Sequence, residues 1–122
     1  MRENNVVLME ISVEEASKKL GQKNVFLLDV RLPEEFAVSK IKGFHLIPLH
    51  ELPSRIGELS KHKKKEILVI CHHGSRSLYA ASMLRNAGYN AKSIVGGLAS
   101  WSEKIDKSIP KYIKGPFGVM KA

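Results

Sequence analysis

EILVICHHGSRSLYAASMLRNAG, residues 66–88, carries the clearest structural pattern in this chain. Its apolar run 67–70 is typical of a buried parallel strand. Cys71 ends the run, and a polar loop follows it. Apolar residues then recur with the spacing of one helix face over 80–87, and Gly88 is a typical residue just past a helix end. The only cysteine of the protein therefore lies where a predicted strand passes into a predicted helix.

A junction of this kind stabilises a bound anion. The first N–H groups of a helix have no intrahelical partners, and the helix dipole adds partial positive charge at the same end. A thiolate at Cys71 is such an anion. Arg76 adds a cation that stays protonated, and Gly74 allows the backbone to turn sharply close to a bound group. A lone cysteine is by default a buried structural thiol, but these neighbours favour a catalytic one.

The pattern Cys71-x-x-Gly74-x-Arg76-Ser77 after an apolar strand resembles the active loop of the rhodanese family of sulfurtransferases. The resemblance covers residues 9–112 and departs from the family at Ser39-Lys40, where members often have Gly-His, and at Phe44, which replaces a small residue. These departures concern the turn shape near the third predicted strand and leave the predicted chemistry unchanged. Further motifs that carry the resemblance are Leu28-Asp29-Val30-Arg31, Glu35-Phe36, Ile41-x-Gly43, Ile47-Pro48, Gly88-Tyr89, Gly96-Gly97 and Trp101.

The resemblance implies an α/β fold, namely a single rhodanese-like domain over residues 9–112 with a central, mostly parallel five-stranded sheet and helices on both faces. The residue patterns agree, because predicted strands alternate with predicted helices. Ligands of such sheets bind at the carboxyl ends of the strands, where Cys71 lies. Gly115, Pro116 and Gly118 break any regular pattern, so residues 113–122 are predicted to form an irregular tail. Strands are predicted at 6–11, 25–30, 67–70 and 89–95, with a turn around Gly43 and a short third strand within 41–47, and helices at 14–20, from Pro33, at 51–59, from the Cys71 loop to Gly88, and at 98–105.

The predicted site has a reactive loop and a supporting pair. Asp29 and Arg31 end the neighbouring predicted strand and can reach the base of the loop, where we expect them to pair structurally. Histidines beside Cys71 make a poor metal site, because consecutive residues rarely chelate one ion and no further cysteine completes a ligand set. We expect no metal and no cofactor. The resemblance implies that Cys71 and Arg76 are catalytic and that the rest of the loop binds the substrate, namely His72, His73, Gly74, Ser75 and Ser77.

The resemblance implies a sulfurtransferase with a covalent intermediate. A small anionic donor such as thiosulfate, or a persulfide, gives its outer sulfur to the Cys71 thiolate, and the resulting persulfide passes it to a thiol, cyanide or a sulfur-carrier protein. The chain has no second cysteine, so the acceptor is external. One alternative is a non-catalytic sulfur-relay or regulatory interaction module. The other is a cysteine phosphatase, but phosphatases of similar fold place five residues between the loop cysteine and arginine, whereas four separate Cys71 from Arg76.

Length and composition set limits on the protein class. A chain of 122 residues suits one domain, and 43% hydrophobic residues are ordinary for a globular protein. No apolar run approaches the roughly 20 residues of a membrane helix, and the first residues lack a signal-peptide core. With a single cysteine, this predicts a cytoplasmic protein with no membrane partner. Residues 1–60 contain eight Lys or Arg and nine Asp or Glu, whereas residues 61–122 contain twelve and three. We interpret the basic half as a solvated lysine-rich face and expect no nucleic-acid partner.

Overall fold

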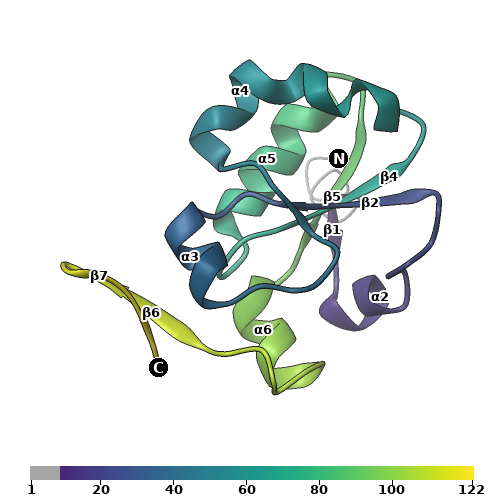
Figure 1. Cartoon of the computed structure of the whole chain (residues 1–122). Coiled ribbons are helices and arrows are strands. Elements are labelled where there is room, and N and C mark those ends of the chain that lie inside the picture. Colours follow the sequence, from purple (N-terminus) through teal and green to yellow (C-terminus); the bar gives the residue numbers. More distant parts are fainter. Residues whose placement is uncertain (1–8) are drawn as a thin grey trace.

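A parallel sheet forms the frame of the molecule (Figure 1). The structure is a computed structural model that describes residues 9–122. Within these residues the central sheet contains β1 (Glu10–Ile11), β2 (Val25–Asp29), β3 (His45–Leu46), β4 (Glu66–Ile70) and β5 (Asn90–Ile94). The strands lie in the order β1-β5-β4-β2-β3, and each pairing is parallel. The predicted five-stranded parallel sheet is therefore confirmed.

Helices cover both faces of this sheet, as predicted (Figure 1). One face is covered by α4 and α5, together with the short 3-10 helices η1 and η2, and the other by α2 and α6. The remaining helix, α3, follows β2 at the edge of the sheet where the site lies. The helices are α2 (Val13–Ser17), α3 (Pro33–Val38), η1 (Leu49–Glu51), α4 (Leu52–Arg55), η2 (Ile56–His62), α5 (Ser75–Asn86) and α6 (Gly97–Lys104).

Two apolar layers, one on each face of the sheet, hold these elements together. Alternate side chains of a strand point to opposite faces, so β4 sends Ile67 and Val69 into one layer and Leu68 and Ile70 into the other. All four side chains are fully buried. Burial of each such side chain stabilises the fold by about 1.5–3 kcal/mol. A continuous apolar run in the sequence is therefore what a strand covered on both faces requires.

Three predicted elements differ from the observed ones at their boundaries. Ser12 caps the first helix, since its Oγ accepts a hydrogen bond from the Glu15 N–H at 3.1 Å, but this helix ends at Ser17 rather than at residue 20. The helix predicted over 51–59 is instead the succession η1, α4 and η2, with a proline in the first turn of α4. For the strand predicted over 6–11, Glu10 and Ile11 form β1, and residues 6–8 lie outside the described part.

The prediction of an irregular tail is wrong. Residues 113–122 belong mostly to an antiparallel hairpin of β6 (Tyr112–Gly115) and β7 (Gly118–Lys121). Gly118 has a φ of +111°, a conformation that favours glycine. The glycines and the proline at 115–118 therefore make a turn between two strands, whereas the sequence pattern was interpreted as the end of regular structure.

Parallel pairing brings the carboxyl ends of β2 and β4 together. Asp29 is in register with Ile70, and the Val30 N–H donates to the Ile70 carbonyl at 3.0 Å. Cys71, which follows β4, and Arg31, which follows β2, therefore lie at the same edge of the sheet.

Among residues 9–122, no helix combines the length and apolar character needed to cross a bilayer.

Candidate active site at Cys71

The Cys71 loop holds the sulfur atom with backbone donors. Cys71 Sγ accepts hydrogen bonds from the Gly74 N–H at 3.0 Å and the Ser77 N–H at 3.3 Å, and its side chain is buried. Gly74 has a φ of +114° just before α5 begins, which a residue with a side chain rarely adopts. The geometry expected from the sequence is present, because N–H groups at a helix start converge on the cysteine. Such donors stabilise a negatively charged sulfur.

The start of α6 holds this loop from behind. The Leu98 N–H donates to the Cys71 carbonyl at 2.8 Å, and the Ala99 N–H donates to the His72 carbonyl at 3.0 Å. Gly97 makes the approach possible, since a Cβ atom there would lie 2.5 Å from the Cys71 carbonyl oxygen. The Gly96-Gly97 segment before α6 therefore fixes the Cys71 loop.

Two buried hydroxyl groups lie behind the thiol. Ser77 Oγ is 3.3 Å from Cys71 Sγ and 2.7 Å from Ser93 Oγ, and it donates to the Gly74 carbonyl at 3.1 Å. Ser93 was missed by the sequence reasoning. Its position two residues after Ala91 places it on the buried face of a predicted strand beside the one that ends at Cys71. A serine at such a core position is the signal that could have identified it.

Arg76 is paired with a buried carboxylate. Its two terminal nitrogens donate to Glu35 Oε1 at 2.6 Å and Oε2 at 2.8 Å, and the Glu35 side chain has no exposed surface. From the sequence, Glu35 was identified only as part of a motif that carries the family resemblance, and Arg76 was expected to be a cation for the bound anion. In the structure, the charge of Arg76 is balanced by Glu35.

Glu35 also receives two further donors. The Leu32 N–H donates to Oε1 at 3.0 Å, and the Tyr112 hydroxyl donates to Oε2 at 2.7 Å. Burial by itself would raise the pKa of Glu35, but the hydrogen bonds from Arg76, Leu32 and Tyr112 outweigh it and lower the pKa to about 2. Glu35 is therefore ionised near neutral pH.

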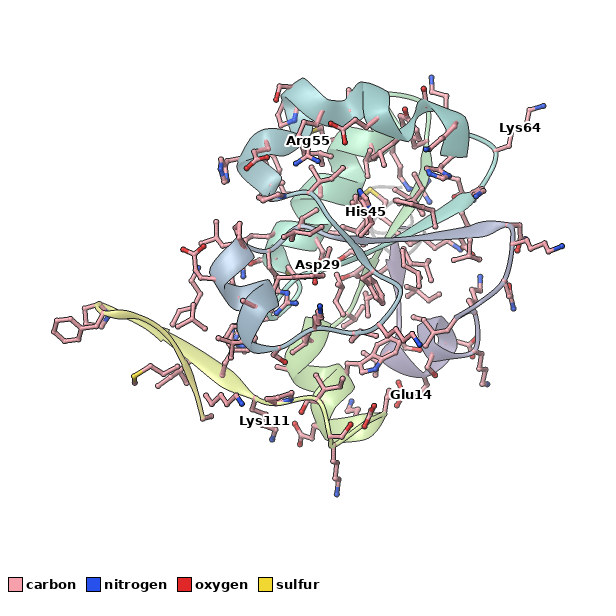
Figure 2. All side chains as sticks on the ribbon, viewed as in Figure 1. Glu14, Asp29, His45, Arg55, Lys64 and Lys111 are labelled. Carbon is pink, nitrogen blue, oxygen red and sulfur yellow. The ribbon has the colours of Figure 1, made fainter. Side chains whose placement is uncertain are left out.

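Asp29 and Arg31 form the expected structural pair. Arg31 Nη2 donates to Asp29 Oδ2 at 2.8 Å, both side chains are buried, and Asp29 lies in the interior between the layers (Figure 2). Burial opposes the charge of Arg31, yet the hydrogen bond and the charge of Asp29 raise its pKa. Arg31 Nη1 also donates to the Tyr112 hydroxyl at 3.1 Å. The pair thus supports the site from below, through Tyr112.

His72 and His73 lie side by side at the mouth of the loop. The His72 ring stacks on Tyr112 with centroids 4.0 Å apart and contacts the His73 ring at 3.9 Å. Burial, and next the neighbouring His73, lower the pKa of His72 to about 4. His72 is therefore neutral near pH 7. Tyr112 was not predicted to belong to the site, because it stands at the end of the predicted domain.

A cavity of about 480 Å³ opens in front of the loop. A larger cavity of about 690 Å³ lies beside Phe36, Phe44 and Trp101, but its lining contains no cysteine, serine or histidine. The smaller cavity therefore marks the candidate site, since four residues of the Cys71 loop line it. It is lined by His72, His73, Ser75, Arg76, Tyr112, Ile113 and Lys114.

Comparisons with known proteins agree with this geometry. Residues 12–104 match the family model described as the Rhodanese-like domain. The chloroplastic Rhodanese-like/PpiC domain-containing protein 12 of Arabidopsis thaliana is 33% identical over 111 residues, covering 84% of this chain and 37% of that protein. The putative sulfur carrier protein YrkF of Bacillus subtilis is 35% identical over 106 residues, covering 85% and 56%. The chain thus spans less than two thirds of both curated relatives. The solved structure of the human single-domain sulfurtransferase TSTD1 is similar with a TM-score of 0.69 and 28% identity, covering 79% of this chain and 96% of that one.

Proposed function

This chain belongs to the family of rhodanese-like domains, and we propose from this premise that it is a sulfurtransferase. It moves a sulfane sulfur from thiosulfate or a persulfide donor, through a persulfide on Cys71, to a thiol, cyanide or a sulfur-carrier protein. The observation that carries the proposal is the pair of N–H groups, from Gly74 and Ser77, that converge on the sulfur of the only cysteine. Such donors favour a charged sulfur both before and after transfer.

In the loading step, the Cys71 thiolate attacks the outer sulfur of thiosulfate. A bond forms between the two sulfur atoms, the sulfur–sulfur bond of thiosulfate breaks, and sulfite leaves with the electron pair. The product is a Cys71 persulfide with the same total charge on both sides of the reaction. The cavity in front of the loop is large enough for this small anion, and Cys71 Sγ faces the loop amides that hold the added charge.

In the unloading step, a nucleophile attacks the outer sulfur of the persulfide. The bond between the two sulfur atoms breaks, and its electron pair returns to Cys71 as a thiolate. With cyanide the product is thiocyanate, and with a thiolate it is a new persulfide. The chain has no second cysteine, so the acceptor comes from outside. A reducing compartment such as the cytoplasm keeps the Cys71 thiol available for another cycle.

Arg76 acts in this proposal as a positioning residue. Its bidentate bond with Glu35 ties the first turn of α5 to α3, so it fixes the turn that supplies the Ser77 N–H. The cation that attracts an anionic donor is instead Lys114, which lines the cavity, is more exposed than Arg76 and lies 3.7 Å from Glu35 Oε1.

The test is the conversion of thiosulfate and cyanide to thiocyanate by the wild type and by Cys71→Ser. The hydroxyl is close in size to the thiol and a very poor nucleophile at neutral pH, so the folded variant should lose transfer. Mass spectrometry of the wild type after thiosulfate should show one added sulfur atom on Cys71. Retained transfer in Cys71→Ser, with a native circular dichroism spectrum, would contradict the mechanism.

A sulfur-relay module without turnover is the second candidate, and the relative named as a putative sulfur carrier favours it. The same experiment separates the two. A relay module would show the added sulfur on Cys71 after a persulfide donor but no sustained thiocyanate production. A sulfurtransferase shows both.

A further inference from the structure

The β6–β7 hairpin is anchored on the candidate site at one end. Tyr112, its first residue, is 3% exposed, stacks on His72 and donates to Glu35. β7 contacts α3, and Val119 of β7 packs against the apolar layer that α2 and α6 cover. The base of the hairpin is therefore fixed relative to the Cys71 loop, while the rest extends away from the body of the domain (Figure 1).

The hairpin presents apolar side chains that the described part of the chain leaves at least half exposed. Ile113 and Met120 are cross-strand neighbours, so they share a face, and they are 52% and 56% exposed. Phe117, at the turn, is 98% exposed. Three of the six large apolar side chains that are exposed within residues 9–122 therefore lie on this hairpin. Such clustering on a protruding element is typical of a protein contact.

The charge around these side chains has one sign. Residues 107–122 contain four lysines and no acidic residue. Lys111 directly precedes β6 (Figure 2), and Lys114 and Lys121 are on the two strands. A partner with a complementary surface is acidic around an apolar patch. A second copy in a symmetric pair would place like charges against each other, and a nucleic acid offers no thiol to the site.

The hairpin and the reactive loop border the same cavity. Ile113 and Lys114 line it from one side, and His72 and Arg76 line it from the other. A protein bound along the exposed face of the hairpin would therefore present a neighbouring thiol to the sulfur on Cys71.

We propose that the β6–β7 hairpin is the docking arm for the protein that accepts the sulfur, a partner whose contact surface is apolar and ringed by acidic side chains. The proposal rests on the proposed sulfurtransferase function and adds the class of acceptor. In the transfer, the partner's thiolate attacks the outer sulfur of the Cys71 persulfide, the sulfur–sulfur bond breaks, and the Cys71 thiolate leaves. No oxidant or reductant is needed.

The test uses the full chain loaded with thiosulfate and a synthetic peptide acceptor. The peptide carries one cysteine next to leucines, flanked by aspartates and glutamates, and a matched peptide has lysines at the acidic positions. Transfer to each is followed by mass spectrometry, and transfer to cyanide by thiocyanate formation. The variants are Phe117→Ser with Met120→Ser and, separately, Lys121→Glu. Tyr79→Ser, at an exposed apolar residue of α5, and Lys64→Glu, at an exposed residue beside β4, are the matched controls.

We expect the wild type to prefer the acidic peptide, and both hairpin variants to lower kcat/KM for it by about tenfold, as loss of a central apolar or charged contact typically does. The controls should match the wild type, and cyanide transfer should be the same in every variant. Equal use of the acidic peptide by the wild type and the hairpin variants would overturn the proposal. The proposal would also be overturned if the hairpin variants abolished self-association, measured by light scattering, while peptide transfer stayed unchanged. The same holds if they abolished binding of single-stranded RNA without changing peptide transfer. If the wild type produces no thiocyanate, it is the sulfurtransferase function that fails instead.

Discussion

Glu35 is the carboxylate on which the donors of the site converge. Arg76, Leu32 and Tyr112 all donate to it, and Lys114 approaches it at 3.7 Å. A buried charge is costly unless it is paired and hydrogen-bonded. Removing Arg76 would leave this buried charge with its strongest partner missing, so the effect of an Arg76 substitution on activity includes a loss of structure.

We predict that Arg76→Met lowers the free energy of unfolding by about 2–4 kcal/mol, because it leaves Glu35 buried without its cation. Glu35→Gln in the same chain removes that charge and should recover part of the loss. The loss of unfolding free energy in the double variant should therefore be smaller than the sum of the two single losses by about 1 kcal/mol or more. Urea unfolding of the four proteins measures the cycle, and additive effects would show that the pair contributes no coupling.

The neutral state of His72 gives the protein a pH dependence of stability. The pKa of His72 is lowered from about 6.5 in an unfolded chain to about 4, first by burial and then by His73. Between these values the unfolded chain binds more protons than the folded one, so stability falls as pH decreases from 6.5 towards 4 and then levels off for this residue.

His72→Phe tests this origin, because the phenyl ring can still stack on Tyr112 but does not titrate. Thermal unfolding of the wild type and the variant between pH 7 and pH 4 should show a smaller decrease in Tm for the variant. Contributions of other residues, such as His62, cancel in the difference. Parallel curves for the two proteins would assign the dependence to other groups.

The candidate nucleophile was identifiable from the sequence, whereas most of its environment was not. Cys71 and Gly74 have a spacing that depends only on the local chain, and local patterns are what a sequence displays. Ser93 and Tyr112 reach the site through strand pairing and through a hairpin, so their roles depend on contacts between distant segments. Glu35 was visible as part of a motif, but its pairing with Arg76 is likewise a tertiary contact.

At the scale of single elements, the junction of α6 with the Cys71 loop is a close backbone contact. Gly97 has a φ of +60°, and a Cβ atom there would meet the Cys71 and His72 carbonyls at 2.5 and 2.6 Å. A side chain at this position would push α6 away from the loop, and the Leu98 and Ala99 donors would move with it.

We predict that Gly97→Ala lowers stability by about 2–4 kcal/mol, because it adds both a clash and an unfavourable backbone angle, and that it reduces sulfur transfer in whatever fraction folds. Gly57→Ala is the control, since a Cβ atom at Gly57 meets nothing within 4 Å, and its effect should stay within about 0.5 kcal/mol. Thermal unfolding and thiocyanate formation provide the two measurements. Equal stability of the two variants would argue against the close approach.

Loop length is expected to select sulfur over phosphate. The four residues between Cys71 and Arg76 bring the Gly74 and Ser77 N–H groups onto one atom. A phosphate group has several oxygens and needs a wider ring of donors. We predict that the protein transfers sulfur from thiosulfate to cyanide and that hydrolysis of an aryl phosphate by the same preparation is negligible. Efficient phosphatase activity that disappears in Cys71→Ser would contradict the assignment.

Lengthening the same loop by one residue, with a matched control insertion, tests whether its length matters. One glycine inserted between Gly74 and Arg76 would widen the ring of donors around the sulfur, so we expect slower sulfur transfer. One glycine inserted between Lys63 and Lys64, in the turn before β4, serves as the control. The result is measured as kcat/KM for thiosulfate. If both insertions have the same effect, loop width is not what matters.

The elements themselves were predicted well where the sequence pattern is repeated over several residues. The apolar run of β4 and the helical spacing of α5 are long enough to be distinctive. The hairpin failed because its signals, glycine and proline at 115–118, are shared by turns and by irregular segments. What separates the two is pairing between β6 and β7, which is set by tertiary contacts such as Tyr112 on His72.

At the scale of the whole molecule, the positive charge is concentrated in residues 61–122, with twelve Lys or Arg against three Asp or Glu. Because Glu35 balances Arg76, the attraction of an anionic donor depends on the lysines nearest the cavity, of which Lys114 lines it. We predict that kcat/KM for thiosulfate decreases as potassium chloride is added, since the Debye length shortens from about 30 Å at 0.01 M to about 8 Å at 0.15 M. A rate independent of salt would leave these lysines with a role in solubility alone.

The contacts that complete the site join segments that are far apart in the chain. Tyr112 meets Arg31 and Glu35 across 81 and 77 residues, and Leu98 donates to Cys71 from the last helix. Contacts of this range form late in folding, because closing a large loop costs chain entropy before the contact itself stabilises the chain. During synthesis, Cys71 leaves the ribosome before Gly97 and Tyr112 do. The thiol is therefore made early and its environment late, so a partly synthesised chain has a cysteine but no organised sulfur site.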